Sequence, residues 1–384
     1  SGGEDCALFE CNKTMASPFT RSASRAQGKA FWARLLRASG LLYLARKWVQ
    51  RHGTIVLTFH RVLTDSELQQ TASLGGMIVR HRTFAAFLEY ASHACEFADL
   101  AQEPDWRAGA KLKLAVTFDD GWSDNAHAAY PIACQHKIPL VIFIVPERTG
   151  TALPFWPERT AAALDRSPAA NGSRRSAISI EKAIEELKEL PARERERRIV
   201  QMADSQVATE SSAAVDRTMT WDQITELHAG GVIFGSHTST HEILTVIPTA
   251  QAQQEIVSSR EVIQQKINAP CSLFSYPNGD ASVQVREMVA EAGYKLAFLN
   301  QEPGVWTRDC DPYLIPRVNV CEYHLVDSRG EFSPVIFDYA VVWSAAKGLL
   351  SRLLSKRLQK FQSARQISDK AWKPTEKKPL EKSS

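Results

Sequence analysis

The chain has 384 residues, of which 44% are hydrophobic and 23% are charged, and its formal net charge is +3. This composition is typical of a soluble globular protein with one large core or two modest ones. No apolar run is long enough to span a bilayer, which argues against a membrane-spanning chain. No secretory segment is visible in the sequence. The seven cysteines are odd in number, irregularly spaced and free of C-x-x-C pairs, which indicates reduced thiols and a cytoplasmic location.

In chain order, residues 1–29 are expected to be disordered, and residues 31–51 are predicted to form a basic amphipathic helix that ends at Gly53. Strands and helices then alternate. The predicted strands are 54–59, 114–118, 140–145, 232–236, 272–275, 294–299 and 313–318. The predicted helices between them are 84–93, 126–137, 221–229, 249–267 and 283–292.

Residues 150–217 interrupt this alternation and are predicted to be an insertion or lid, with a charged helix over 180–204 that breaks at Pro191. Residues 341–361 are a second amphipathic helix, and a lysine-rich, disordered tail is expected after it. We therefore divide the chain into 1–52 (leader and helix), 53–325 (the α/β domain) and 326–384 (helix and tail).

Alternating strands and helices imply a parallel sheet, either closed into a barrel or open and doubly wound. Both arrangements bring the carboxyl ends of the strands to one rim, where sites form. The polar residues at these ends are His60, Asp119, Asp120, His237, His241 and Tyr276. No G-x-G-x-x-G or Walker-type loop is present, which counts against nucleotide chemistry, and no nucleic-acid partner is expected.

Two of these strand ends carry metal-competent residues. Asp119 and Asp120 follow a buried strand, and buried carboxylates need a partner, so they hold a cation or form a solvated turn. His237 and His241 are four residues apart, so they would lie on the same side of a helical turn, where both imidazoles could reach one ion. They are either zinc ligands or two unrelated surface histidines. Because the same placement occurs twice, we favour a metal site.

Three motifs carry a family resemblance: TFDDG (117–121), HTSTH (237–241) and FSYPNG (274–279). In this order and at these separations they resemble the polysaccharide deacetylases, the NodB-homology enzymes of carbohydrate esterase family four, over residues 54–322. The resemblance implies a distorted (β/α)7 barrel, here with a helical insertion and flanking amphipathic helices. It also implies metal-dependent removal of acetyl groups, N-acetyl more than O-acetyl, from an acetylated polysaccharide or oligosaccharide.

The resemblance also implies roles for individual residues. Asp119 becomes the general base, and the backbone N–H of Tyr276 helps to hold the oxyanion. The implied ligands of a divalent metal ion, with zinc as the first expectation, are Asp120, His237 and His241. The implied substrate-binding residues are Trp122, Pro277 and Asn278, with Trp156 as a further stacking candidate; the alternative for both tryptophans is a place in the core.

The chain departs from the family pattern in two places. The third motif lacks the arginine that steadies the base, and Arg317 is our candidate to replace it, although a salt-bridged barrel arginine is equally consistent. No clean late Leu-x-x-x-His strand is present. A permuted subset, similar to the poly-N-acetylglucosamine deacetylases, takes its general acid from an early strand, and His60 matches that version, with His324 as the rival. The alternative to a catalytic role for His60 is a histidine at the edge of the core whose ring is hydrogen-bonded to a backbone carbonyl.

Two other functional classes stay open at this point. A metal-dependent amidase acting on a small molecule would keep the same ligands. A non-catalytic carbohydrate-binding barrel would be expected to have lost a ligand or the base, and neither is lost here. The basic amphipathic helices at 31–51 and 341–361 predict peripheral contact with the inner face of a membrane. The alternative is that both helices pack on the barrel with their charges toward water.

Overall fold

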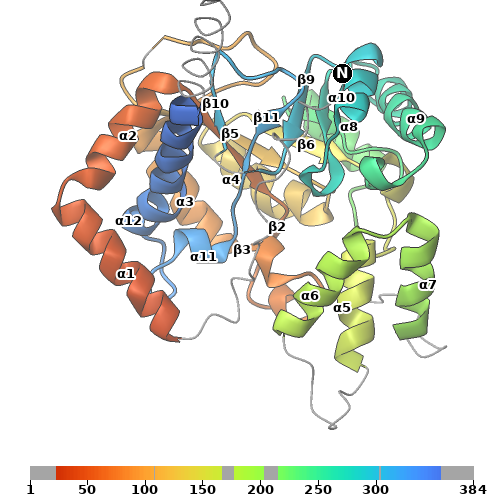
Figure 1. The fold of residues 1–384 in the computed structure, drawn as a ribbon, viewed down its shortest axis with the longest axis horizontal. Helices are drawn as coiled ribbons and strands as arrows, with labels where there is room; N and C mark the ends of the chain where they lie inside the picture. Colours follow the sequence, from red (N-terminus) through yellow and green to blue (C-terminus); the bar gives the residue numbers. More distant parts are fainter. Residues whose placement is uncertain (1–22, 108, 167–176, 203–214, 302–303, 356–384) are drawn as a thin grey trace, which may run out of the picture.

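The computed structural model describes residues 23–107, 109–166, 177–202, 215–301 and 304–355. Its centre is a barrel of parallel strands, with helices around the outside (Figure 1). The barrel strands in spatial order are β1 (Thr54–Phe59), β5 (Leu112–Phe118), β6 (Leu140–Ile144), β7 (Ile233–Ser236), β8 (Leu273–Ser275), β9 (Leu296–Leu299) and the pair β11 (Ile315–Pro316) and β12 (Val318–Asn319).

The last two strands close the barrel. β11 pairs with β9, whereas β12 pairs with β1, so the chain changes partner at Arg317. The predicted strand over 313–318 is therefore two short strands, because one segment has to bridge the first and last strands of the sheet. The closed barrel is confirmed, and the open doubly wound sheet is excluded.

Side chains alternate between the two faces of each barrel strand. A cluster of buried residues fills the barrel interior, and it includes Val56 from β1, Val141 and Phe143 from β6, and Phe298 from β9. The neighbouring residues on the strands, such as Leu57, belong to the larger core between the barrel and its helices. Strands buried on both faces explain the continuous apolar runs in the sequence.

The helices predicted between the strands are confirmed, with shifted ends. They are α3 (His81–Ala94), α4 (Tyr130–Gln135), α8 (Trp221–Ala229), α9 (Thr249–Ile267) and α10 (Val283–Glu291). The segment 126–137 differs most, because it begins as a π turn, η3 (Asn125–Ala129), before α4. Four short strands lie beside the barrel: β4 (Cys95–Phe97) pairs with β5, β10 (Val305–Trp306) is antiparallel to β1, and β2 (Arg61–Leu63) pairs with β3 (Ile78–Arg80).

The insertion forms three helices, α5 (Trp156–Arg166), α6 (Ala177–Lys188) and α7 (Ala192–Met202), which lie together on the side of the barrel away from α1 and α2 (Figure 1). The predicted break at Pro191 separates α6 from α7. These helices share a small core with the barrel loop that follows β7. Its buried members are Trp156, Ile184, Leu187, Ile199 and Ile243.

The N-terminal prediction was wrong in two respects. Residues 23–29 are helical rather than disordered, and the single helix predicted over 31–51 is two helices, α1 (Ala23–Ala38) and α2 (Leu41–His52). Gly40 separates them with φ at 78°, a left-handed conformation that glycine adopts without cost. Residues 1–22 lie outside the described part.

The C-terminal segment contains α11 (Glu322–Leu325), α12 (Pro334–Phe337), the π turn η7 (Asp338–Val342) and a helical continuation over 343–355. The first part of the apolar stripe predicted to contact a membrane is buried in the main core instead: Val342, Ala345, Ala346 and Leu349. Leu350 and Leu354, further along the same stripe, are exposed. Residues 356–384, including the predicted tail, lie outside the described part. Within the described ranges, no helix combines the length and apolarity needed to cross a bilayer.

Candidate active site

Neighbouring barrel strands bring the predicted site residues to one rim. Phe59 pairs with Phe118, so His60 and Asp119 follow in adjacent positions, and the Asp119 N–H donates to the Phe59 carbonyl oxygen at 3.0 Å. His237 enters the same rim from β7, where its N–H donates to the carbonyl oxygen of Ile144 at 2.9 Å. Strand pairing alone therefore assembles side chains that are far apart in the sequence.

Asp120, His237 and His241 form a buried cluster whose candidate ligand atoms all lie within 4.8 Å of one another. The Asp120 Oδ1 is 3.7 Å from the His237 Nε2 and 3.4 Å from the His241 Nε2. The His237 Nδ1 lies 2.8 Å from the carbonyl oxygen of Ser275, which fixes the ring so that its Nε2 faces the cluster.

The protonation states of this cluster suit a divalent cation. Burial lowers the pKa of His237 to about 4, so its imidazole is neutral at pH 7 and can act as a ligand. Burial alone would raise the pKa of Asp120, but His241 and the other nearby histidines hold it below its ordinary value. A buried carboxylate with two imidazoles is a donor set that suits a catalytic zinc site.

The helical-turn rationale for the two histidines was wrong. Thr238 and His241 have φ angles of 66° and 69°, so this segment is a loop. The loop is held by the Thr238 Oγ1, which accepts the His241 N–H at 3.0 Å, and by Glu255, whose carboxylate accepts the Thr240 N–H at 2.9 Å. Asp120 also has a positive φ, 72°, and such conformations in non-glycine residues concentrate at functional sites.

Asp119 is held by a bidentate ion pair with Arg317. The Arg317 Nη1 and Nη2 lie 2.8 and 2.6 Å from the two carboxylate oxygens, and both side chains are buried. The Arg317 Nη2 also donates to the Oγ of Ser275 at 2.8 Å, in the motif that lacks an arginine. Burial would raise the pKa of Asp119, but Arg317 and then His237 hold it below its ordinary value, so the carboxylate is ionised.

The structure separates the two candidate general acids. His60 is half-buried at the rim, and its Nδ1 has no hydrogen-bond partner among the described residues. It lies near enough to both aspartates to act on their pKa values, after the larger effects of Arg317 on Asp119 and of His241 on Asp120. His324 lies in α11, where its Nδ1 accepts the N–H of Cys321 at 3.2 Å. His60, and not His324, is therefore grouped with the two aspartates.

The Tyr276 backbone N–H is already engaged. It donates to the carbonyl oxygen of Phe298 at 3.1 Å, as part of the β8–β9 pairing, so it is not an open donor for an oxyanion. In the same loop, Pro277 is buried and Asn278 is half-buried with φ at 58°. The Asn278 Nδ2 is buried without a hydrogen-bond partner among the described residues, so it is an unused donor in this loop.

Trp122 is a buried residue and does not present a stacking surface, so its assignment to substrate binding was wrong. It is 1% exposed, and its Nε1 donates to the Asp120 Oδ2 at 3.1 Å, which leaves Oδ1 for the cluster. Phe155 packs on Trp122 with a centroid separation of 5.2 Å and on His241 at 4.9 Å. Trp156 is likewise buried, in the core of the insertion.

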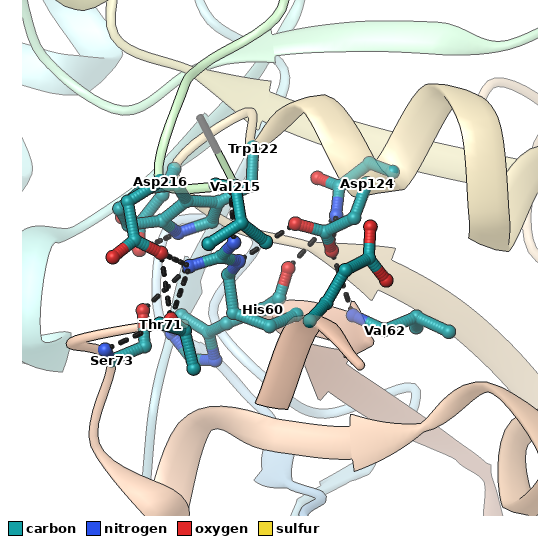
Figure 2. A network of polar contacts seen from close by, with 12 residues as sticks. His60, Val62, Thr71, Ser73, Trp122, Asp124, Val215 and Asp216 are labelled. Atoms are coloured by element: carbon teal, nitrogen blue, oxygen red, sulfur yellow. Dashed lines mark hydrogen bonds and ion pairs between the residues drawn. The ribbon is translucent and has the colours of Figure 1, made fainter. Parts of the chain in front are cut away.

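Behind Trp122 lies a buried ionic network that sequence reasoning missed (Figure 2). The Arg61 guanidinium stacks on the Trp122 ring at 4.1 Å and pairs with Asp124 at 2.7 Å and Asp216 at 2.9 Å. Figure 2 shows the two aspartates on opposite sides of this group, with Thr71 donating to Asp216 at 2.6 Å. The available signals were the position of Arg61 directly after His60 and a third acid, Asp124, close after the first two.

Glu158, on α5, is the second group that the sequence did not reveal. Neither carboxyl oxygen has a hydrogen-bond partner among the described residues, and the side chain is buried. Burial, and then the negative charge of Asp120, raise the pKa of Glu158 to about 8. Glu158 is therefore neutral at pH 7, and it adds no negative charge close to the Asp120 carboxylate.

Comparison with known proteins identifies the family that the central part of the chain resembles. The family model for polysaccharide deacetylase matches residues 107–297. The Bacillus subtilis (strain 168) protein YxkH, which carries the name of a polysaccharide deacetylase, is 28% identical over 223 residues, or 58% of this chain. The matched part spans 56% of the length of that relative. Residues 107–297 of this chain therefore form a polysaccharide deacetylase domain.

Solved structures with a similar backbone fold include two bacterial deacetylases. IcaB from Ammonifex degensii is 17% identical, with a TM-score of 0.49, and the match covers 77% of this chain and 97% of that one. The Streptococcus pyogenes deacetylase PplD, solved in complex with acetate, is 15% identical, with a TM-score of 0.46, over 74% of this chain and 98% of that one.

Proposed function

We propose that this chain is a divalent-metal-dependent hydrolase that removes acetyl groups, N-acetyl in preference to O-acetyl, from a polysaccharide or oligosaccharide. The observation that carries the proposal is the buried cluster of Asp120, His237 and His241 directly beside Asp119, which Arg317 holds ionised. The Asp119 carboxylate is thus available for proton transfer, because the neighbouring Asp120, His237 and His241 side chains form a separate set of candidate metal ligands.

The residues divide the reaction between them. A divalent cation, with zinc as the first candidate, would act as a Lewis acid and lower the pKa of a water molecule at its open position. Asp119 accepts a proton from the attacking water, and Arg317 fixes the orientation of its carboxylate. The Asn278 side-chain amide is our candidate donor to the developing oxyanion, in place of Tyr276. His60 protonates the departing sugar amine.

The proposal is tested by metal analysis of the purified chain together with acetate release from a panel of acetylated glycans and small acetamides. Acetate from N-acetylated glycans, lost on chelation and restored by zinc, is the expected result. Turnover of small acetamides alone would favour the amidase class instead. Binding of glycans without any acetate release would favour a non-catalytic barrel.

His60→Ala is expected to lower kcat by about 10²–10⁴-fold, because the leaving amine would lack a proton donor. His324→Ala is the matched control and should keep acetate release near the wild-type rate, since its imidazole caps α11 away from the aspartates. The measurement is steady-state acetate release at equal metal content. An inactive His324→Ala beside an active His60→Ala would reverse the assignment.

We also propose that the protein contacts the inner face of a membrane through its N-terminal helices. Phe31 and Trp32 on α1 are 62% and 53% exposed, and Leu35 is exposed beside them. The opposite side of α1, with Ala30 and Ala33, is buried. The exposed basic residues Arg34 and Arg37 share this helix, as expected for an amphipathic helix at an anionic surface.

Replacing Phe31, Trp32 and Leu35 together with serine is therefore expected to abolish most co-sedimentation with vesicles that contain anionic lipid at low salt. The control variant carries serine at Leu153 and Val283, two exposed apolar residues outside α1 and α2, and should sediment like the wild type. If the wild-type chain stays in the supernatant, or the triple variant sediments equally well, α1 is not a membrane contact.

A further inference from the structure

A pocket of about 380 Å³ opens beside the candidate metal ligand His241, between the barrel and the helices of the insertion. Phe155 and Trp156 form its apolar wall. Its charged lining residues are Arg148, Arg159, Arg193, Arg195, Glu196 and Glu242. Four arginines against two glutamates leave two positive charges in excess, next to the position where the acetyl group would react.

The two glutamates are already used by two of the arginines. Arg159 pairs with Glu196 at 2.9 Å, and the Arg195 Nη2 pairs with Glu242 at 2.7 Å. Although Arg195 is buried, its Nη1 has no hydrogen-bond partner among the described residues. A buried guanidinium nitrogen without an acceptor is costly, and an anion in the pocket would satisfy it.

The remaining two arginines, Arg148 and Arg193, have no ion-pair partner within the described ranges. Arg148 is half-buried, and its guanidinium lies 5.8 Å from the centre of the Phe155 ring, which in turn packs on His241. Burial, and then the like charge of Arg159, lower the pKa of Arg148. Among the described residues, these two positive charges are therefore not held in a direct ion pair.

We propose that this pocket is a subsite for an anionic group of the substrate, a phosphate or a carboxylate, carried by the glycan near the acetyl group that is removed. The planar guanidinium group suits both anions, because it donates two parallel hydrogen bonds. The inference rests on the proposed deacetylase function and narrows its substrate class from acetylated glycans in general to acidic ones.

The test compares kcat/KM of the metal-loaded enzyme on three N-acetylated disaccharides that differ only in a neutral, carboxylate or phosphate substituent on the neighbouring sugar. For at least one anionic substrate, kcat/KM is expected to be about tenfold higher than for the neutral one, which is the effect of about one charge-assisted hydrogen bond. Arg148→Gln and Arg193→Gln should each reduce that ratio severalfold. Arg197→Gln is the control, because Arg197 lies on α7 like Arg193 but outside the pocket, where it pairs with Glu194. This variant should leave the ratio of the two kcat/KM values unchanged.

A second readout does not depend on turnover. Inorganic phosphate alone should raise the Tm of the wild-type chain and of Arg197→Gln, because a ligand that binds only the folded state stabilises it, and should raise it less in Arg148→Gln and Arg193→Gln. Equal kcat/KM on all three disaccharides, or an equal phosphate effect in every variant, overturns the subsite. Absence of acetate release from every substrate, with the phosphate effect intact, would instead refute the proposed deacetylase function.

Discussion

Asp119→Asn is expected to lower kcat for acetate release by about 10²–10⁴-fold, while the metal content stays at the wild-type level. Asparagine keeps the size of the side chain but cannot accept the proton of the attacking water. It also leaves Arg317 as a buried cation without a carboxylate, so the Tm should fall as well. Acetate release within about threefold of wild type, at full metal content, would exclude Asp119 as the base.

The companion variant Arg317→Gln separates positioning from proton transfer. Arg317 lowers the pKa of Asp119, so its loss raises that pKa, and more of the carboxylate is protonated at a given pH. The acidic limb of the kcat–pH profile should therefore move to higher pH, whereas a merely structural role would lower the rate without moving the profile. The double variant with Asp119→Asn should regain part of the lost Tm, because it has no unpaired buried charge.

His237→Ala and His241→Ala are each expected to remove bound metal and reduce acetate release to background. Each change deletes one of three buried ligands whose donor atoms lie within 4.8 Å of one another. The measurement is metal content per chain after dialysis against metal-free buffer, with circular dichroism to establish that the barrel is intact. His127→Ala, at an exposed histidine outside the cluster, is the control and should retain one ion per chain.

Since a single remaining histidine with Asp120 could still bind weakly at high zinc, the double variant His237→Ala/His241→Ala is the decisive case. Wild-type metal occupancy in that variant would show that the ion lies elsewhere. Occupancy lost together with the circular dichroism signal would show that the metal supports the fold, as structural sites do, rather than only the reaction.

The sequence allowed the barrel and its reactive rim to be predicted because both depend on local signals. Buried strands appear as continuous apolar runs, and polar residues at their carboxyl ends must share one rim. His60 and Asp119 could therefore be grouped before their strands were seen to be paired. The break at Gly40 was also local, but the amphipathic pattern continues across it and outweighed the glycine.

The errors arose where a role depends on a contact from a distant segment. Whether Tyr276 has an open N–H is decided by its pairing with Phe298, and no local pattern encodes that bond. From the sequence, Trp122 is equally consistent with a surface that stacks on a sugar ring and with a core residue. The structure decides between them, because Arg61 lies over its ring, Phe155 packs edge-on against it and the side chain is buried. Glu158 looks like an ordinary charged residue on the surface of a helix, and only the packing of α5 shows that it is buried.

The split between β11 and β12 links the completion of the fold to the completion of the site. Leu57 in the first barrel strand pairs with Val318 in the last, so the sheet stays open until nearly all of the barrel has been synthesised. At ribosomal rates of about 5–20 residues per second, β1 waits on the order of tens of seconds with an unpaired apolar edge. Arg317 arrives with the same strands, so Asp119 has no cation beside it until the barrel closes. The nascent chain is therefore expected to lack the Asp119–Arg317 pair and to be prone to aggregation during this interval. Pairing between strands so far apart in the sequence also predicts slow refolding after denaturation.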